Sequence, residues 1–293
     1  MNDETAPLAA LVKIAKGYKW VLVLGDSDLL SKPQAMAGFK RLSRSLRSLG
    51  IRAAVSCCPP VTVLEGGEKR IKKQGLDDWL IADRYHAVRS LPALFRAAEV
   101  YRDGITDNYN ALQLAEQFKD QLAFSQGIWR WWNGSIWVID DCWKRRALVP
   151  NIARAYLSAA DKLDALVNKV QEPYPGKKRG EWPEEILAWS APVESAAKDL
   201  REGAQDICNL RGIDAALNLA QSYLRVPDDA WDRDPYLLAA KNGVIDLRTD
   251  QIQPALPQQR ITRCAGTAFD PAAKAELFSQ FLEQVQPVPE MRE

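Results

Sequence analysis

The sequence has few of the side chains that many catalytic and metal sites require. Its 293 residues include a single histidine, His86, which argues against a histidine-based triad or a zinc cluster. Of the five cysteines, Cys57 and Cys58 are adjacent, and none has the spacing of paired zinc ligands. An odd number of cysteines without a signal peptide is typical of a reducing compartment, so we expect a cytoplasmic protein.

Two further absences narrow the function. No apolar run approaches the roughly 20 residues of a membrane-spanning helix, so we expect no membrane association. No Gly-x-x-x-x-Gly-Lys-Ser/Thr loop is present, and we therefore expect no helicase or ATPase activity in this chain.

Basic residues are clustered locally, although the net charge is only +1. Each cluster is either a solvated face or a phosphate contact. The three clusters are Lys40, Arg41, Arg44, Arg47 and Arg52; Lys69, Arg70, Lys72 and Lys73; and Lys144, Arg145, Arg146 and Arg154.

The stretch 20–28 is the feature around which the first hundred residues are arranged. A continuous apolar run, 21–24, predicts a strand buried on both faces, and it ends at Gly25. A helical pattern opens at Pro33 and stops at Gly50, and residues 51–55 predict a second strand. This is a β-α-β unit, whose ligands bind beyond the carboxyl ends of the strands.

Two carboxylates follow the first strand at that edge. In an extended chain Asp26 and Asp28 point the same way, so they can converge on a hard cation such as Mg²⁺. The alternative is that they only end the strand and cap the next helix.

A second acidic pair follows an irregular, Pro-containing segment at 57–67 and a charged loop. Gly75 permits a turn, and Asp77 can cap a short helix, with a longer helix expected at 91–101. Asp77 and Asp78 are either a capping turn or a candidate additional acidic site.

A tryptophan-rich segment follows a helix that we expect from Thr106 or Asp107 to Phe124. Asn133-Gly134 between two β-rich runs predicts a hairpin over 128–139. Its four tryptophans either pack across the strands or form a stacking surface for single-stranded bases. The candidate nucleic-acid contacts there are Arg130, Trp131, Trp132, Lys144, Arg145 and Arg146.

The remaining chain predicts helices at 147–170, 183–202 (interrupted near Pro192), 212–224 and 271–285. The loop 172–182 is either an exposed excursion or a nucleic-acid contact through Lys177, Lys178 and Arg179. A hairpin is expected at Asn242-Gly243, with residues 260–263 able to pair with it. The last helix is expected to turn four residues inward: Leu277, Phe281, Leu282 and Val285.

The first region resembles the Toprim-like domain of phage and plasmid primases. The resemblance rests on Asp26-Ser-Asp28 after a strand, a helix, a short strand, and then Gly75-Leu-Asp77-Asp78-Trp-Leu. It implies an α/β fold with a parallel sheet and a catalytic, Mg²⁺-binding role for Asp26 and Asp28. Toprim domains also carry a Glu on an earlier strand, and Glu4 does not take that place.

The second region resembles the helical domain that precedes a superfamily 3 helicase in the same proteins. The residues that carry this resemblance are 106–107, 110–111, 129–137, 237–249, 261–262 and 269–271. The stretch 242–249 is the most specific; the family usually has Gly after Thr249, where this chain has Asp250.

The resemblances imply a Toprim-like α/β domain at 1–103 and a mainly helical pre-helicase domain with small hairpins at 104–293. We expect a fragment of a primase-helicase that makes primers with Mg²⁺, if its Toprim-like site is complete, and that binds single-stranded DNA. Expected partners are a helicase domain or subunit and a second copy of the chain. The alternative is a non-catalytic DNA-binding or assembly module that works with a separately encoded helicase.

Overall fold

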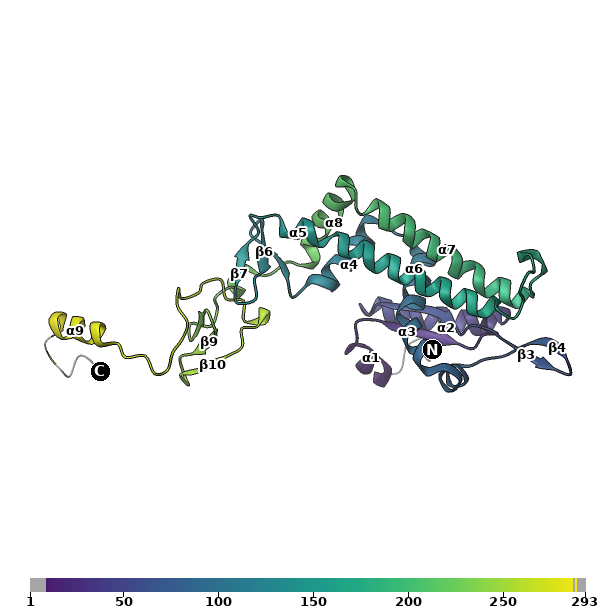
Figure 1. Ribbon diagram of the computed structural model, residues 1–293, viewed down its shortest axis with the longest axis horizontal. Coiled ribbons are helices and arrows are strands. Elements are labelled where there is room, and N and C mark those ends of the chain that lie inside the picture. The colour runs from purple at the N-terminus through teal and green to yellow at the C-terminus, as the bar shows by residue number, and fades with distance from the viewer. Residues whose placement is uncertain (1–8, 287, 289–293) are drawn as a thin grey trace, which may run out of the picture. The chain divides into compact units, whose positions relative to one another are not determined.

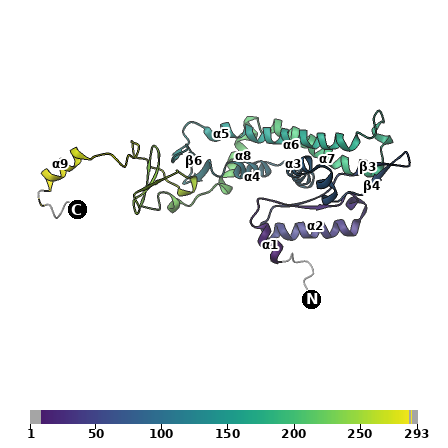
Figure 2. The ribbon, with the colours of Figure 1, turned by 60° about the horizontal axis from the view of Figure 1, so that its bottom comes forward.

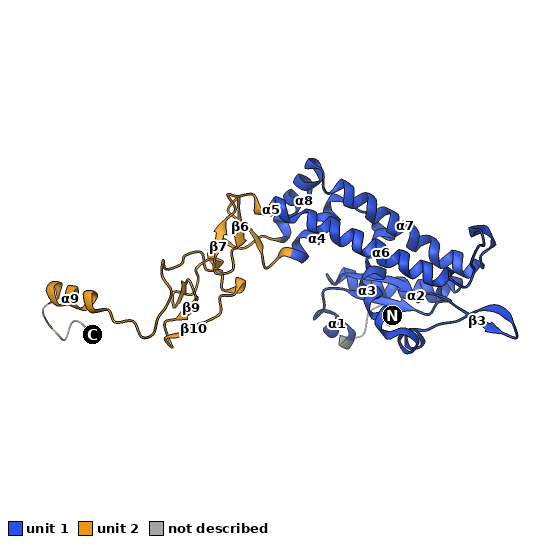
Figure 3. Ribbon diagram, in the orientation of Figure 1, with its two compact units in different colours: residues 1–117, 146–223 blue, residues 118–145, 224–293 orange. Residues whose placement is uncertain are grey.

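The computed structural model describes residues 9–286 and 288, which form two compact units (Figure 3). Unit 1 comprises residues up to 117 together with 146–223, and unit 2 comprises 118–145 together with the residues from 224 onward. Glu4, named in the sequence analysis, lies outside the described residues.

Unit 1 begins with the expected β-α-β unit. After α1 (Ala9–Ala15), strand β1 (Val21–Gly25) is followed by α2 (Pro33–Ser48) and β2 (Ala53–Cys57). The two strands are parallel, with Val21 opposite Ala53 and Gly25 opposite Cys57. Proline suits the first turn of α2 because its missing N–H would have no helical partner there. The predicted crossover is therefore confirmed.

The expectation that β1 is buried on both faces is wrong. Residues 21–24 are half-buried and only Gly25 is fully buried. In the described residues β1 pairs with β2 alone, so one edge of β1 has no neighbouring strand. The apolar side chains of 21 and 23 instead pack against a buried cluster that includes Ala15, Leu46 and Ile51.

A β-hairpin occupies the segment expected to be irregular. Strands β3 (Val61–Glu65) and β4 (Glu68–Lys72) pair antiparallel in register. They are joined by Gly66 and Gly67, both with positive φ, and such paired glycines match the twist of a two-residue hairpin loop. The two prolines at 59–60 come immediately before the hairpin.

Helix α3 (Leu76–Asp103) joins the short helix expected after Asp77 to the helix expected at 91–101. It bends at Asp83, whose backbone is not helical, and it contains Pro92. Its N-cap is Gly75 rather than the expected Asp77.

The remaining helices of unit 1 are α4 (Asp107–Phe118), α6 (Pro150–Gln171), η2 (Arg179–Glu181), α7 (Glu184–Asp206) and α8 (Leu210–Tyr223). Helices α6 and α7 lie side by side (Figures 1 and 2), and α7 runs through Pro192 without the expected interruption. Both pack against α3, so they group with the α/β elements. This grouping differs from the expected division after residue 103.

Packing between α7 and the strand region is shown by Trp189. Its side chain is buried, and its indole N–H donates to the backbone oxygen of Cys57 at 3.2 Å. Buried indoles require such a partner, so this contact fixes α7 at the end of β2.

Unit 2 contains two antiparallel three-stranded sheets. The first has β5 (Leu122–Ser125), β6 (Ile128–Trp132) and β7 (Trp137–Ile139) in that order. The β6–β7 pairing confirms the predicted hairpin. The helix expected to reach Phe124 ends at Phe118, because the following residues form β5. Helix α5 (Lys144–Leu148) contains the sequence boundary between the two units, at residues 145 and 146.

The second sheet has β8 (Leu237–Ala240), β9 (Gly243–Asp246) and β10 (Gln251–Gln253), in the order β10-β9-β8. It confirms the hairpin predicted at Asn242-Gly243. Short helical turns η3 (Asp228–Ala230) and η4 (Pro257–Gln259) flank this sheet. The expected pairing of 260–263 with this hairpin is not among the strand pairs of the described residues; the bridge formed there joins Ala239 to Cys264, one residue later.

Helix α9 (Glu276–Val285) does not bury its apolar residues as expected. Leu277, Phe281 and Val285 are exposed, and Leu282 is half-buried. No core in the described part of unit 2 covers this helix.

Candidate functional site

The loop after β1 is held in place by a second loop. Gly25 ends the strand tightly, because a side chain at this position would lie 2.5 Å from Leu29. The backbone N–H of Ser27 donates to the Gln74 carbonyl, and the Gln74 N–H donates to the Ser27 hydroxyl, both at 2.9 Å. These reciprocal bonds join the loop 26–28 to the loop 73–75.

The extended geometry expected for Asp26 and Asp28 is absent, because the chain turns into η1 (Leu29–Ser31) directly after them. Asp28 has φ −89° and ψ 6°, which is not a strand conformation. Asp26 pairs with Lys73 at 2.6 Å, and Asp28 pairs with Lys32 at 2.5 Å. Each carboxylate therefore has its own lysine.

The second acidic pair meets the first at Gly75. A side chain at position 75 would lie 3.2 Å from Oδ1 of Asp26 and 2.6 Å from Oδ1 of Asp77, so the site is open only because residue 75 is glycine. Asp78 accepts a hydrogen bond from the Gly75 N–H at 3.2 Å. Asp77 thus approaches Asp26 from the first turn of α3, distant in sequence. We call the two segments that carry Asp26, Asp28, Asp77 and Asp78 the acidic loops.

Neighbouring charges shift the titration of this region. The hydrogen bond from Lys32 is the main cause that lowers the pKa of Asp28. The hydrogen bond to Asp26 raises the pKa of Lys73. Burial, together with the charges of Cys57 and Asp26, raises the pKa of Cys58 to about 12, so this thiol stays protonated.

The acidic loops fit a magnesium ion with a partly water-filled shell. Mg²⁺ is usually held by one or two carboxylates, with waters and substrate phosphates as its other ligands. Asp26 and Asp77 supply two carboxylates around the space that glycine leaves at position 75. Within the described residues, no group of three or more His, Cys, Asp or Glu side chains is arranged to hold a metal ion.

The first sheet of unit 2 places its tryptophans in different environments. Trp137 is buried against Trp132 and Trp231, with ring centroids 5.8 and 5.7 Å away, and its N–H donates to the Pro257 carbonyl. This side of the sheet is a core. Arg130 lies over the Trp231 ring, 5.2 Å from its centroid, so it takes part in that packing.

Trp131 lies on the other face of β6, since neighbouring residues of a strand point to opposite sides. It is half-buried, and the ammonium of Lys144 lies 5.4 Å from its ring centroid. Of the tryptophans expected to stack on bases, Trp131 is thus accessible beside a cation, and Trp132 packs against Trp137.

Several of the other expected DNA contacts already pair with acids. Arg145 binds the buried carboxylate of Asp140 at 2.7 Å, and Arg146 pairs with Asp214. Arg179 pairs with Glu194 at 2.6 Å. In the same loop the Lys177 ammonium lies 5.7 Å from the ring of Tyr174, and the Lys178 side chain is exposed.

Arg52, expected to belong to a basic face, is instead part of a buried ion cluster. It hydrogen-bonds Glu99, at 2.6 Å through Nε, and pairs with Glu116. Its guanidinium also lies over the rings of Phe95 and Tyr109. Burial favours the neutral form, but the two glutamates outweigh it and raise the pKa of Arg52.

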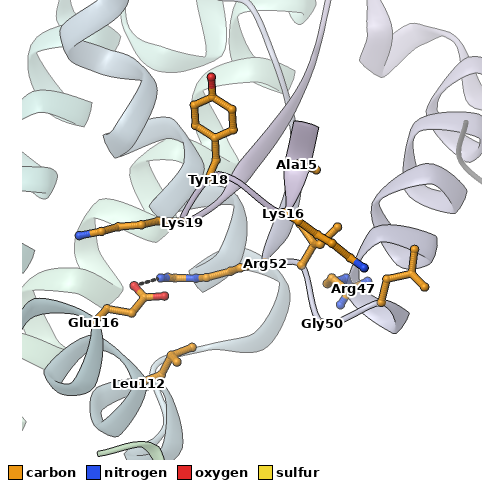
Figure 4. A pocket seen from close by; sticks show the side chains of 11 residues that line it. Ala15, Lys16, Tyr18, Lys19, Arg47, Gly50, Arg52, Leu112 and Glu116 are labelled. Atoms are coloured by element: carbon orange, nitrogen blue, oxygen red, sulfur yellow. Dashed lines mark hydrogen bonds and ion pairs between the residues drawn. The ribbon is translucent and has the colours of Figure 1, made fainter. Parts of the chain in front are cut away.

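A cavity of about 470 Å³ opens beside this cluster at the amino ends of β1 and β2 (Figure 4). Lys16, Lys19 and Arg47 line it, and the Arg52 side chain reaches toward Glu116 of α4. The basic residues come from the end of α1, the following loop and the end of α2. Sequence reasoning identified Arg47 but not the two lysines, because they lie in separate segments.

In unit 2 the stretch 242–249 is hydrogen-bonded to the segment 269–271, which also carries the resemblance to the pre-helicase domain. The Asn242 side chain donates to the Phe269 carbonyl at 2.9 Å and accepts from the Phe269 N–H at 2.8 Å. Asn242 therefore fixes the segment 269–271 beside the β8–β9 turn. The Asp250 backbone has a positive φ of 53°, a conformation in which glycine is more usual.

None of the helices in residues 9–286 is long and apolar enough to cross a bilayer. Comparison with curated proteins gives no match. A family model with the description "D5 N terminal like" matches residues 111–287, which is more than half of the chain. The chain therefore belongs to the D5 N terminal like family, a domain of phage and plasmid primase-helicase proteins.

Proposed function

We propose that the chain acts in phage or plasmid DNA replication as a segment of a primase-helicase that makes primers at the acidic loops. In this proposal, residues 1–103 form a Toprim-like region. The observation that carries it is the approach of Asp26 and Asp77 to the open position at Gly75, ahead of the family match at 111–287.

In primer synthesis the 3′ hydroxyl oxygen of one nucleotide attacks the α-phosphorus of a nucleoside triphosphate. The bond between the α- and β-phosphates breaks, pyrophosphate leaves, and the hydroxyl proton passes to solvent. Bound Mg²⁺ would supply positive charge to the phosphates. Asp26, with Asp77 and Asp28 beside it, would hold that ion in place. Lys73 and Lys32, which now neutralise Asp26 and Asp28, have exposed side chains that can move to the substrate phosphates.

The decisive experiment measures synthesis of short oligonucleotides from a single-stranded template, nucleotides and Mg²⁺. Asp26→Asn should abolish the products and weaken Mg²⁺ binding in calorimetry, because it removes a ligand charge. Asp214→Asn is the matched control: its carboxylate is 43% exposed against 45% for Asp26, and each pairs with one cation. Products that persist in Asp26→Asn would contradict the proposal.

A second candidate is a non-catalytic DNA-binding or assembly module that works with a separately encoded helicase. The observation in its favour is that Asp26 and Asp28 are each paired with a lysine, as in an ordinary charged surface. Binding of single-stranded DNA by the unmodified chain, without any synthesis, would select this module.

Either function includes contact of unit 2 with single-stranded DNA through Trp131 and Lys144. Removing one aromatic stacking platform costs about 1–3 kcal/mol of binding per base. Trp131→Ala should therefore weaken DNA binding by at least about fivefold at an unchanged melting temperature. In Trp137→Ala the melting temperature should fall instead, because that ring is in the core. Equal DNA affinity of Trp131→Ala and the unmodified chain would exclude the contact.

A further inference from the structure

A basic cavity of about 540 Å³ lies between α2 and the end of α3 in unit 1. On α2, Lys40, Arg44 and Arg47 are spaced i, i+4 and i+7, so they lie on one face of the helix. Arg102 and Asp103 line the cavity from α3. Four cationic side chains thus face a single carboxylate.

That carboxylate is already engaged. Arg102 donates through Nε to Asp103 at 2.7 Å and through Nη1 to the Ala53 carbonyl of β2 at 3.0 Å. Ser43 of α2 donates to the same carbonyl at 3.2 Å. Arg102 is therefore held rigidly at the wall of the cavity, and Asp103 is occupied by it.

The three α2 cations have no such acid. In the described parts of the chain, no carboxylate forms an ion pair with Lys40, Arg44 or Arg47. Burial is the main cause that lowers the pKa of Arg47, repulsion from Arg102 and Arg44 adds to it, and the charge of Asp103 opposes it. The local potential is positive, and an anion would relieve it.

An apolar cavity of about 180 Å³ adjoins the basic one. The two share Lys40, Val55, Ala98 and Tyr101 in their walls. The remaining wall of the apolar cavity is formed largely by Leu30, Met36, Cys57, Trp189, Pro192 and Val193. Leu30, in the wall of the apolar cavity, comes two residues after Asp28 in the chain.

We propose that these joined cavities bind single-stranded nucleic acid. Backbone phosphates would contact Lys40, Arg44, Arg47 and Arg102, and an unpaired base would enter the apolar cavity against Tyr101. A duplex is disfavoured because its bases are stacked and paired, whereas a single strand can present one base to an apolar wall. The inference rests on the proposed role in DNA replication.

The first test measures binding of a fluorescent single-stranded oligonucleotide to the full chain, in EDTA and without nucleotides. Lys40→Gln combined with Arg44→Gln removes two phosphate contacts. For single strands each contact contributes about 0.7 to the salt slope, so the slope should fall by about 1.4 and affinity at 0.1 M salt by about 25-fold. The control, Lys162→Gln with Lys198→Gln, removes two exposed charges from α6 and α7.

The second test separates base contact from charge. Tyr101→Ala should weaken single-strand binding at least about fivefold without changing the salt slope, because stacking is not ionic. The matched control is Tyr85→Ala: both tyrosines lie on α3, and they are 61% and 64% exposed at positions 85 and 101.

The inference would be overturned by no binding of single strands by the unmodified chain, by equal losses in the two double variants, or by duplex bound as tightly as single strand. Competition by a free nucleoside triphosphate as strong as that of an oligonucleotide would also overturn it, because the site would then be a mononucleotide pocket. Primer synthesis does not enter these assays. If the acidic loops do not catalyse primer synthesis, the DNA-binding results for the cavities are unaffected. Likewise, a failure of the cavities to bind DNA leaves the synthesis assay of Asp26→Asn unaffected.

Discussion

The two ends of the β1–β2 pair carry charges of very different kinds. At the amino end, Arg52 is only 14% exposed and is held by Glu99, Glu116 and two aromatic rings. At the carboxyl end, Asp26 and Lys73 form an exposed pair. A buried charge that loses its partner is costly, whereas an exposed one can exchange its partner for water or a ligand. On this ground we propose a structural role for the charges at the first end and ligand binding for those at the second.

The largest expected difference in stability comes from removing one cation at each end of the β1–β2 pair. Arg52→Met should lower the free energy of unfolding by about 3–5 kcal/mol, because it leaves Glu99 charged and buried. Lys73→Met, at the exposed end, should cost less than about 1 kcal/mol. Urea denaturation of both variants measures the two values.

The double variant Arg52→Met with Glu99→Met sharpens this test. Replacing both partners of a buried ion pair by apolar residues is often close to neutral, so part of the stability lost in Arg52→Met should return. Similar small losses for Arg52→Met and Lys73→Met would show that the two ends do not differ.

A smaller change in the free energy of unfolding is expected from the buried thiols of Cys57 and Cys58. Burial raises the pKa of Cys57 and of Cys58 to about 12, from an ordinary value of 9.0. The unfolded chain releases these protons first, so the thiols' contribution is complete below pH 9 and is lost as the pH rises toward 12. We expect a loss of about 1 kcal/mol per thiol at pH 10.

Urea denaturation at pH 8 and pH 10 measures this loss, and Cys57→Ala with Cys58→Ala should reduce it. The exposed thiols of Cys142, Cys208 and Cys264 serve as an internal reference, since they should react with a thiol reagent in the native state. Native-state reaction of Cys58 at the same rate would contradict its burial.

Local patterns in the sequence were sufficient for the β-α-β unit and for both Asn-Gly hairpins. These patterns are the apolar run of a strand, the proline that begins α2 and the Asn-Gly turn. Each acts over a few residues, so the element that it forms does not depend on distant parts of the chain. The same run did not reveal that β1 is half-buried, because burial depends on how many strands and helices lie beside it.

The candidate site was predictable only in part for the same reason. Asp26 and Asp28 were found from their position after β1, but the turn into η1 removed the extended geometry. The carboxylate that approaches Asp26 is Asp77, about fifty residues later in the chain. Arg102 and Tyr101, at the end of α3, carried no motif that would have joined them to Lys40 on α2.

By itself, the sequence determined the secondary-structure elements around the acidic loops, the two hairpins and, through residues 111–287, the family. Only the tertiary structure decided which charges are buried, which acids meet at Gly75, and which cations share a cavity with Tyr101. The physical reason is the distance along the chain over which each interaction acts. Backbone propensities act between neighbours along the chain, whereas desolvation and Coulomb forces act between whatever side chains the fold brings together.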